Sequence, residues 1–102
     1  MVDIVADHNS DGVGMVISCD YDHCFTLDPE YFTAIINAAL QRGHRVIICT
    51  YRLLSDPMPH QFSGIEVFYT ERKAKKAFLE SRGIKVDVWF DDRPEVILYD
   101  GL

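Results

Sequence analysis

Two aspartates, Asp20 and Asp22, stand one residue apart directly after the apolar run "MVISC" at residues 15–19. Two carboxylates this close repel one another, and the folding of a strand does not require them. Such a pair can divide the work of a group transfer, because one carboxylate can attack while the other moves a proton. The pair is therefore a candidate catalytic site. Which chemistry it could perform depends on the residues that follow the other apolar runs.

Polar and charged residues also follow the other apolar runs of the chain. Each of these runs ends close to a hydroxyl, an amine or a carboxylate. If the runs are parallel strands, these side chains converge on one edge of a sheet. In chain order, the residues are Thr50, the lysines Lys73, Lys75 and Lys76, and the acidic pair Asp91 and Asp92.

The apolar patterns predict strands that alternate with helices. Short runs rich in β-branched residues predict buried strands, and longer segments with apolar residues at helical spacing predict helices. The alternation favours an α/β fold: a Rossmann-like three-layer sandwich with a mainly parallel sheet of about four to five strands. The predicted strands are 15–19, 45–50, 65–69 and 86–90, the predicted helices are 28–43 and 71–83, and a loop with two prolines is predicted at 51–64.

Four carboxylates at one sheet edge would repel one another strongly unless a cation shares the site. Oxygen ligands suit a hard divalent ion, and Mg²⁺ is typical of sites that handle phosphate. We therefore expect Mg²⁺ as cofactor. A bound cation would attract a phosphate, whose oxygens a threonine hydroxyl and a lysine ammonium can hold. The predicted metal ligands are Asp20, Asp22, Asp91 and Asp92.

Four motifs in this order resemble those of the haloacid dehalogenase superfamily of phosphotransferases. Its pattern is a strand ending in Asp-x-Asp, a strand ending in Thr or Ser, a lysine, and a strand ending in an acidic pair. The matching segments here are "VISCDYD", "VIICT", "ERKAKK" and "VWFDD", so the resemblance covers about residues 15–95. The closing "DDRP" at 91–94 is also similar to the last motif of the 5′(3′)-deoxyribonucleotidases in that superfamily.

The resemblance implies a role for each matching residue. Asp20 would be the nucleophile and a metal ligand, and Asp22 the general acid and base with its backbone carbonyl on the metal. Thr50 would hydrogen-bond the phosphoryl group. Asp91 would be the acidic metal ligand, with Asp92 beside it.

The resemblance also implies a lysine that neutralises the phosphoaspartate, and the segment 71–83 offers three. Lys73 is the predicted residue, because it would fall in the first helical turn near the strand end. Lys76, one turn further on, is the alternative. Lys75 is expected to point elsewhere and to be solvated.

The chain departs from the superfamily pattern at two points. His23 and Cys24 follow Asp22, where the superfamily most often has a glycine or serine. His23 is interpreted as an exposed loop residue, although a catalytic role is the alternative. Neither the spacing from Asp22 to Asp28 nor the segment after Lys73 leaves room for an inserted cap domain, so a minimal, capless member with an open site is predicted. The stretch 51–64 is also too short for the usual extra helix.

Length and composition limit the number of domains, the class of partner and the cellular compartment that we expect. The chain of 102 residues predicts one domain over 1–102, with 1–14 as a lead-in or an edge strand. Its net charge of −6 argues against structural nucleic-acid binding, and no apolar run approaches the about 18 residues of a membrane span. Three cysteines without paired spacing favour a reduced, cytoplasmic protein.

The leading functional hypothesis is a Mg²⁺-dependent phosphatase that acts on a phosphate monoester through a phosphoaspartate at Asp20. Its partner would be a small phosphorylated substrate or the phosphorylated end of a macromolecule, and a second copy of the chain is a candidate cover for the open site. The alternative is a catalytically weak or inactive module that binds Mg²⁺ and phosphate. A phosphoacceptor domain of response-regulator type ranks third, because there the acidic pair normally follows the first strand.

Overall fold

The computed structural model describes residues 14–101 and contains a four-stranded, wholly parallel sheet with the order β3-β2-β1-β4. A 3₁₀ turn follows β1, and three α-helices lie among the described residues. The elements are β1 Val16–Cys19, η1 Phe25–Leu27, α2 Pro29–Gln41, β2 Arg45–Thr50, β3 Glu66–Tyr69, α3 Lys75–Glu80, β4 Val88–Phe90 and α4 Glu95–Leu98.

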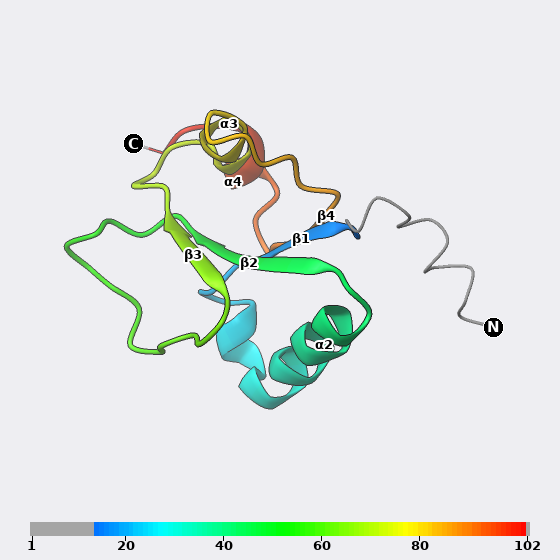
Figure 1. Ribbon diagram of the computed structural model, residues 1–102. Coiled ribbons are helices and arrows are strands. Elements are labelled where there is room, and N and C mark those ends of the chain that lie inside the picture. The colour runs from blue at the N-terminus through cyan, green and yellow to red at the C-terminus, as the bar shows by residue number, and fades with distance from the viewer. Residues whose placement is uncertain (1–13, 102) are drawn as a thin grey trace.

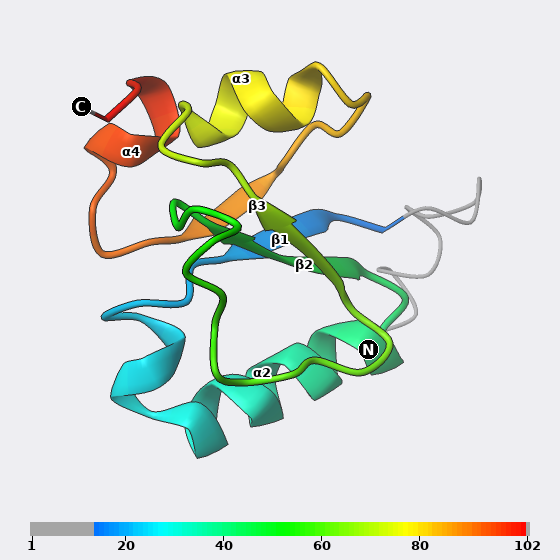
Figure 2. The ribbon, with the colours of Figure 1, turned by 90° about the vertical axis from the view of Figure 1, so that its left-hand side faces the viewer.

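The helices cover both faces of the sheet, as Figures 1 and 2 show: α2 lies on one face, and α3 and α4 lie on the other. This is the predicted α/β three-layer arrangement, and no segment of residues 14–101 forms a separate cap domain. The chain moves outward from β1 to β2 and β3, and then returns past β1 to β4. The direction of strand addition therefore reverses between β1 and β4, where ligands bind in open parallel sheets.

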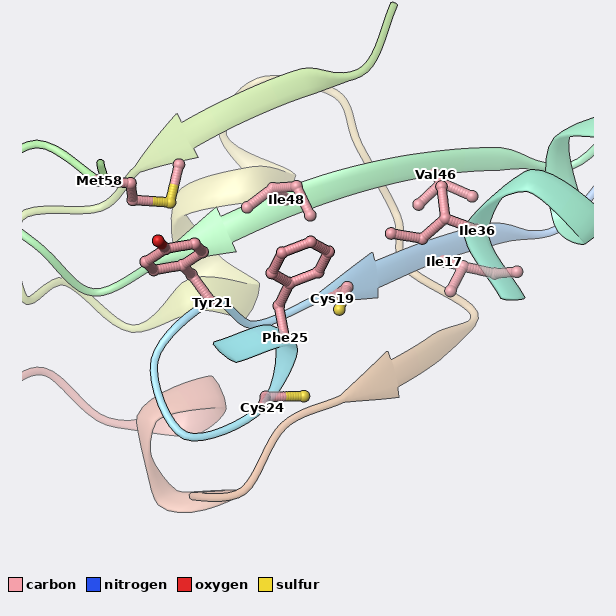
Figure 3. Packing of buried hydrophobic residues seen from close by; sticks show 9 residues of the cluster. All are labelled: Ile17, Cys19, Tyr21, Cys24, Phe25, Ile36, Val46, Ile48 and Met58. Carbon is pink, nitrogen blue, oxygen red and sulfur yellow. The ribbon is translucent and has the colours of Figure 1, made fainter. Parts of the chain in front are cut away.

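Alternate residues of β2 build the core on both faces of the sheet. Val46 and Ile48 pack on the α2 face, where they meet Ile36 of α2 (Figure 3). Ile47 packs on the opposite face against Leu79 of α3, and both are fully buried. Burying one such side chain stabilises the fold by about 1.5–3 kcal/mol. The strand is buried on both sides, which explains its unbroken apolar sequence.

The connection from β2 to β3 is the loop that its prolines predicted. Met58 and Phe62 from this loop pack against the cluster on the α2 face. The Met58 backbone N–H donates a hydrogen bond of 2.8 Å to Tyr69 Oη. The loop thus completes the layer beside α2 without a helix of its own.

The beginning of α2 agrees with its sequence signals. Asp28 Oδ1 accepts a hydrogen bond of 3.1 Å from the Tyr31 backbone N–H, and Pro29 opens the first turn. Gly43 follows the helix with a φ of 85°, a left-handed conformation that glycine adopts without strain. Local signals therefore suffice to place α2.

The prediction of a helix over 71–83 is wrong at its beginning, because α3 starts only at Lys75. The residues just before it form a turn in which Glu71 and Arg72 have φ values of 54° and 67°. A left-handed conformation at a non-glycine residue interrupts a right-handed helix. The shift changes which lysine occupies the first helical turn.

The described residues also bear on the predictions about membrane spans and cysteines. No helix within 14–101 is both long enough and apolar enough to cross a membrane. Cys19, Cys24 and Cys49 are all buried free thiols. The predicted lead-in or edge strand at 1–14 lies, apart from Gly14, outside the described residues.

Candidate active site at the carboxyl edge of the sheet

The site begins where β1 and β4, neighbours in the sheet, both end in aspartates. The Asp20 backbone N–H donates a hydrogen bond of 2.8 Å to the Phe90 carbonyl, which extends the pairing of the two strands. Ligand atoms of Asp20, Asp91 and Asp92 all lie within 4.8 Å of one another. The ends of β1 and β4 therefore bring three carboxylates together.

Lys75 is the cation of this cluster. Its Nζ atom lies 2.8 Å from Asp20 Oδ1 and 2.6 Å from Asp91 Oδ2, and only 1% of its side chain is exposed. The expectation that Lys75 is solvated is wrong, because the late start of α3 points this residue toward the sheet edge. Lys73 is exposed, and Lys76 pairs on the surface with Glu80 at 2.7 Å.

The cluster carries more negative than positive charge. Three carboxylates and one ammonium leave a formal charge of −2 when all four groups are ionised. Burial raises the pKa of Asp20 to about 7, and attraction to Lys75 offsets this only in part. Burial would lower the pKa of Lys75, but Asp20 and Asp91 together outweigh it and raise this pKa. One divalent cation would neutralise the cluster, and an all-oxygen donor set fits Mg²⁺.

The second aspartate of the motif has a different environment. Asp22 forms a two-pronged ion pair with Arg52, in which Nε to Oδ2 and Nη2 to Oδ1 both measure 2.9 Å. This contact holds the pKa of Asp22 below its usual value. Arg52 is held in turn by the carbonyl oxygens of Asp56 and Pro57. The Asp22 carboxylate thus faces the β2–β3 loop and not the three-aspartate cluster.

Sequence reasoning assigned no role to Arg52, although a signal was present. Arg52 follows Thr50 by two residues, just beyond the end of β2, and the carboxyl ends of parallel strands share one edge. A guanidinium at that place can meet a carboxylate from the neighbouring strand end. Which carboxylate it meets depended on the tertiary structure.

Thr50 lies at the end of β2, as predicted, but it is fully buried. Its Oγ1 atom accepts a hydrogen bond of 3.3 Å from the Arg52 backbone N–H. Thr50 is absent from the residues that line the pocket above the cluster. The hydroxyl therefore supports the turn that presents Arg52, and its contact with a phosphoryl group stays a prediction.

An open pocket of about 440 Å³ lies above the cluster. It also receives the exposed His23, whose φ of 55° is the left-handed conformation that usually favours glycine. Arg52, Arg72 and Arg93 add positive charge to its wall. The lining residues are Asp20, Asp22, His23, Tyr51, Arg52, Leu53, Asp56, Arg72, Lys75, Asp91, Asp92, Arg93, Val96 and Gly101.

The turn after β4 fixes the orientation of one carboxylate. The Arg93 backbone N–H donates a hydrogen bond of 3.0 Å to Asp91 Oδ1, while Asp91 Oδ2 contacts Lys75. The Arg93 side chain pairs with Glu95 at the surface. The "DDRP" segment therefore holds Asp91 by a backbone contact.

The cysteines beside the cluster are poor candidates for a reactive nucleophile. Burial is the main cause of a raised pKa at Cys19, Cys24 and Cys49, and it brings the pKa of Cys49 to about 12. A thiol of this kind carries almost no reactive thiolate at neutral pH. The carboxylates are therefore better candidates for a nucleophile than these thiols.

Comparison of the chain with protein-family models, curated proteins and solved structures gave no match. The superfamily resemblance stays a prediction from the four motifs.

Proposed function

We propose that this protein is a Mg²⁺-dependent phosphatase that hydrolyses a phosphate monoester through a phosphoaspartate at Asp20. The observation that carries the proposal is the grouping of Asp20, Asp91 and Asp92 within 4.8 Å, with Lys75 bonded to two of them. The cluster lies at the switch point of a parallel sheet and opens into a pocket.

The three clustered aspartates would hold the cation. Mg²⁺ held there would supply positive charge, which would let a dianionic phosphate approach the carboxylates and would keep Asp20 ionised. Lys75 holds one oxygen of Asp20 and one of Asp91, so it fixes both side chains before substrate arrives. Its ammonium also offsets negative charge that gathers on the transferring phosphoryl group.

The reaction would proceed in two displacements at phosphorus. In the first, a carboxylate oxygen of Asp20 forms a bond to phosphorus while the bond to the ester oxygen breaks, and the leaving alkoxide takes a proton from Asp22. In the second, a water molecule attacks the phosphoaspartate, Asp22 accepts the water proton, and inorganic phosphate leaves. Both carboxyl groups return to their initial states.

Arg52 adds a requirement to this scheme. Asp22 accepts two hydrogen bonds from Arg52 as a carboxylate, and a protonated carboxyl group cannot keep this pairing. Asp22 must therefore leave Arg52 and take up a proton from solvent before it can donate one to the leaving group. The guanidinium released in this way is suited to the incoming phosphate.

Hydrolysis of a generic aryl phosphate with Mg²⁺ tests the proposal. We expect Asp20→Asn to lower the rate by about 10³-fold or more, because the amide is a very poor nucleophile. Asp28→Asn is the matched control, since asparagine also caps helices well and Asp28 lies at the start of α2. Equal rates for the parent protein and Asp20→Asn would refute the assigned nucleophile.

A module that binds Mg²⁺ and phosphate without turnover is the second candidate. The ion pair between Asp22 and Arg52 favours it, because the general acid is occupied in the substrate-free protein. Calorimetric Mg²⁺ binding that Asp91→Asn weakens, with no hydrolysis of a broad panel of phosphate esters, would select this module over the enzyme.

A further inference from the structure

The turn between β3 and α3 decides where Lys75 lies, and it is a strained turn. Glu71 and Arg72 are consecutive non-glycine residues with left-handed φ values of 54° and 67°. This conformation is strained for a residue with a Cβ atom, so other contacts must hold the turn in this shape. Lys75 follows three residues after Arg72 and begins α3.

The beginning of α3 does not supply its own cap. Ala74 precedes the helix and has no side chain that could accept a hydrogen bond. Asp100 supplies that acceptor from beyond α4, because its Oδ1 atom accepts a hydrogen bond of 2.6 Å from the Ala74 backbone N–H. The Gly101 backbone N–H donates a second bond of 2.6 Å to the Arg72 carbonyl. Residues 99–101, here called the clip, thus hold the side of the strained turn that leads into α3, whereas the Glu71 and Arg72 backbone N–H groups donate to the Arg52 and Tyr51 carbonyls after β2.

The clip is itself attached to the end of β2. Tyr51 Oη donates a hydrogen bond of 2.7 Å to the Tyr99 carbonyl. The Tyr51 ring packs on Gly101, where an added Cβ atom would lie 2.7 Å from Cε2. The clip therefore links the residues after β2 to the residues before α3. Both segments border the pocket.

We infer that Asp100 is a positioning residue that holds the first turn of α3 so that the Lys75 ammonium lies between Asp20 and Asp91. Asp100 accepts the hydrogen bond of the Ala74 N–H, and Ala74 directly precedes Lys75. A shift of this turn therefore moves the base of the lysine side chain. The placement of Lys75 can be tested by itself. Only the catalytic consequence of the inference rests on the proposed function.

Amine labelling of the full chain, read residue by residue by mass spectrometry, measures this placement. Lys75 is buried, whereas Lys76 is exposed on the same helix and serves as the internal standard. In Asp100→Ala we expect the ratio of labelling rates, Lys75 to Lys76, to rise at least about fivefold. Asp100→Asn keeps an oxygen that can accept the Ala74 N–H, and we expect it to restore a ratio close to that of the parent protein.

Asp87→Ala is the matched control. Asp87 Oδ2 accepts a hydrogen bond of 2.8 Å from the Val16 backbone N–H, so this variant loses the same kind of contact at the opposite end of β4. We expect its labelling ratio to stay at the parent value. An unchanged ratio in Asp100→Ala, or an equal rise in Asp87→Ala, would overturn the inference, because the clip would then contribute no more than general stability.

Hydrolysis of an aryl phosphate separates this inference from the proposed function. With Mg²⁺ present, we expect Asp100→Ala to lower kcat by about 10- to 100-fold, as a small displacement of a catalytic group does, and Asp100→Asn to recover most of it. A parent protein without activity would refute the proposed function while the labelling result still decides the inference. An active parent with unchanged labelling and kcat in Asp100→Ala would refute the inference alone.

Discussion

Lys75 Nζ lies 2.8 Å from Asp20 Oδ1, although 55 residues separate the two in the chain. The same ammonium bonds Asp91 at 2.6 Å, so one buried cation joins the ends of β1 and β4. A buried ion pair of this kind is costly to break, because the partner left behind keeps an uncompensated charge. This pair of contacts belongs to the candidate site and also stabilises the fold, so a change at Lys75 should affect both.

Replacing Lys75 with methionine should destabilise the metal-free protein by about 3–5 kcal/mol, because it leaves buried carboxylates without their cation. Lys73→Met should change the free energy of unfolding by less than about 0.5 kcal/mol, because Lys73 is exposed. Urea unfolding in a chelating buffer measures both. A larger loss in Lys73→Met than in Lys75→Met would contradict the observed placement of the lysines.

Mg²⁺ affinity should depend on the aspartates of the cluster and not on the Asp22 carboxylate. Asp91→Asn should weaken binding by about 10- to 100-fold, whereas Asp22→Asn should change it less than about threefold, because Asp22 pairs with Arg52. Isothermal titration calorimetry compares the two variants. A loss in Asp22→Asn equal to that in Asp91→Asn would show that the Asp22 side chain turns toward the ion.

The contribution of Asp20 to the stability of the metal-free protein should fall as the pH rises from about 4 to about 7. Burial raises the pKa of Asp20 from its ordinary value of 3.8 to about 7, so within this window the folded protein keeps a proton that the unfolded chain releases. The loss from this group is at most about 4 kcal/mol.

Asp20→Asn isolates this contribution, because asparagine does not titrate. Urea unfolding in chelator at several pH values should show the stability of the parent falling relative to the variant up to about pH 7, with a constant difference above it. A parallel pH dependence of the two proteins would mean that Asp20 is already ionised at acidic pH.

His23→Gly should stabilise the protein by up to about 1 kcal/mol. His23 has a φ of 55°, which strains a residue with a Cβ atom, whereas glycine adopts it freely and gives back part of the gain through its more flexible unfolded state. The hydrogen bond from His23 to Thr26 Oγ1 is made by the backbone and is kept. Thermal unfolding checks the sign, and His23→Ala is the control that keeps the strain.

Local sequence patterns were enough to predict which residues end the strands. The apolar runs before Asp20, Thr50 and Asp91 are strands because β-branched and aromatic side chains fit a buried sheet. Long crossover connections, through α2 from β1 to β2 and through a loop from β2 to β3, leave the neighbouring strands parallel. Asp28 and Gly43 likewise marked the limits of α2. The grouping of acidic residues at one edge follows from these local features and from the common direction of the strands.

The tertiary structure alone decided which cation meets which carboxylate. Glu71 and Arg72 take left-handed conformations that neither residue prefers by itself, and this turn delays α3 until Lys75 faces Asp20 and Asp91. Arg52 meets Asp22 for a similar reason, since the β2–β3 loop wraps around its guanidinium. Composition and spacing are local properties, whereas strained turns and buried ion pairs persist only because contacts distant in the chain hold them.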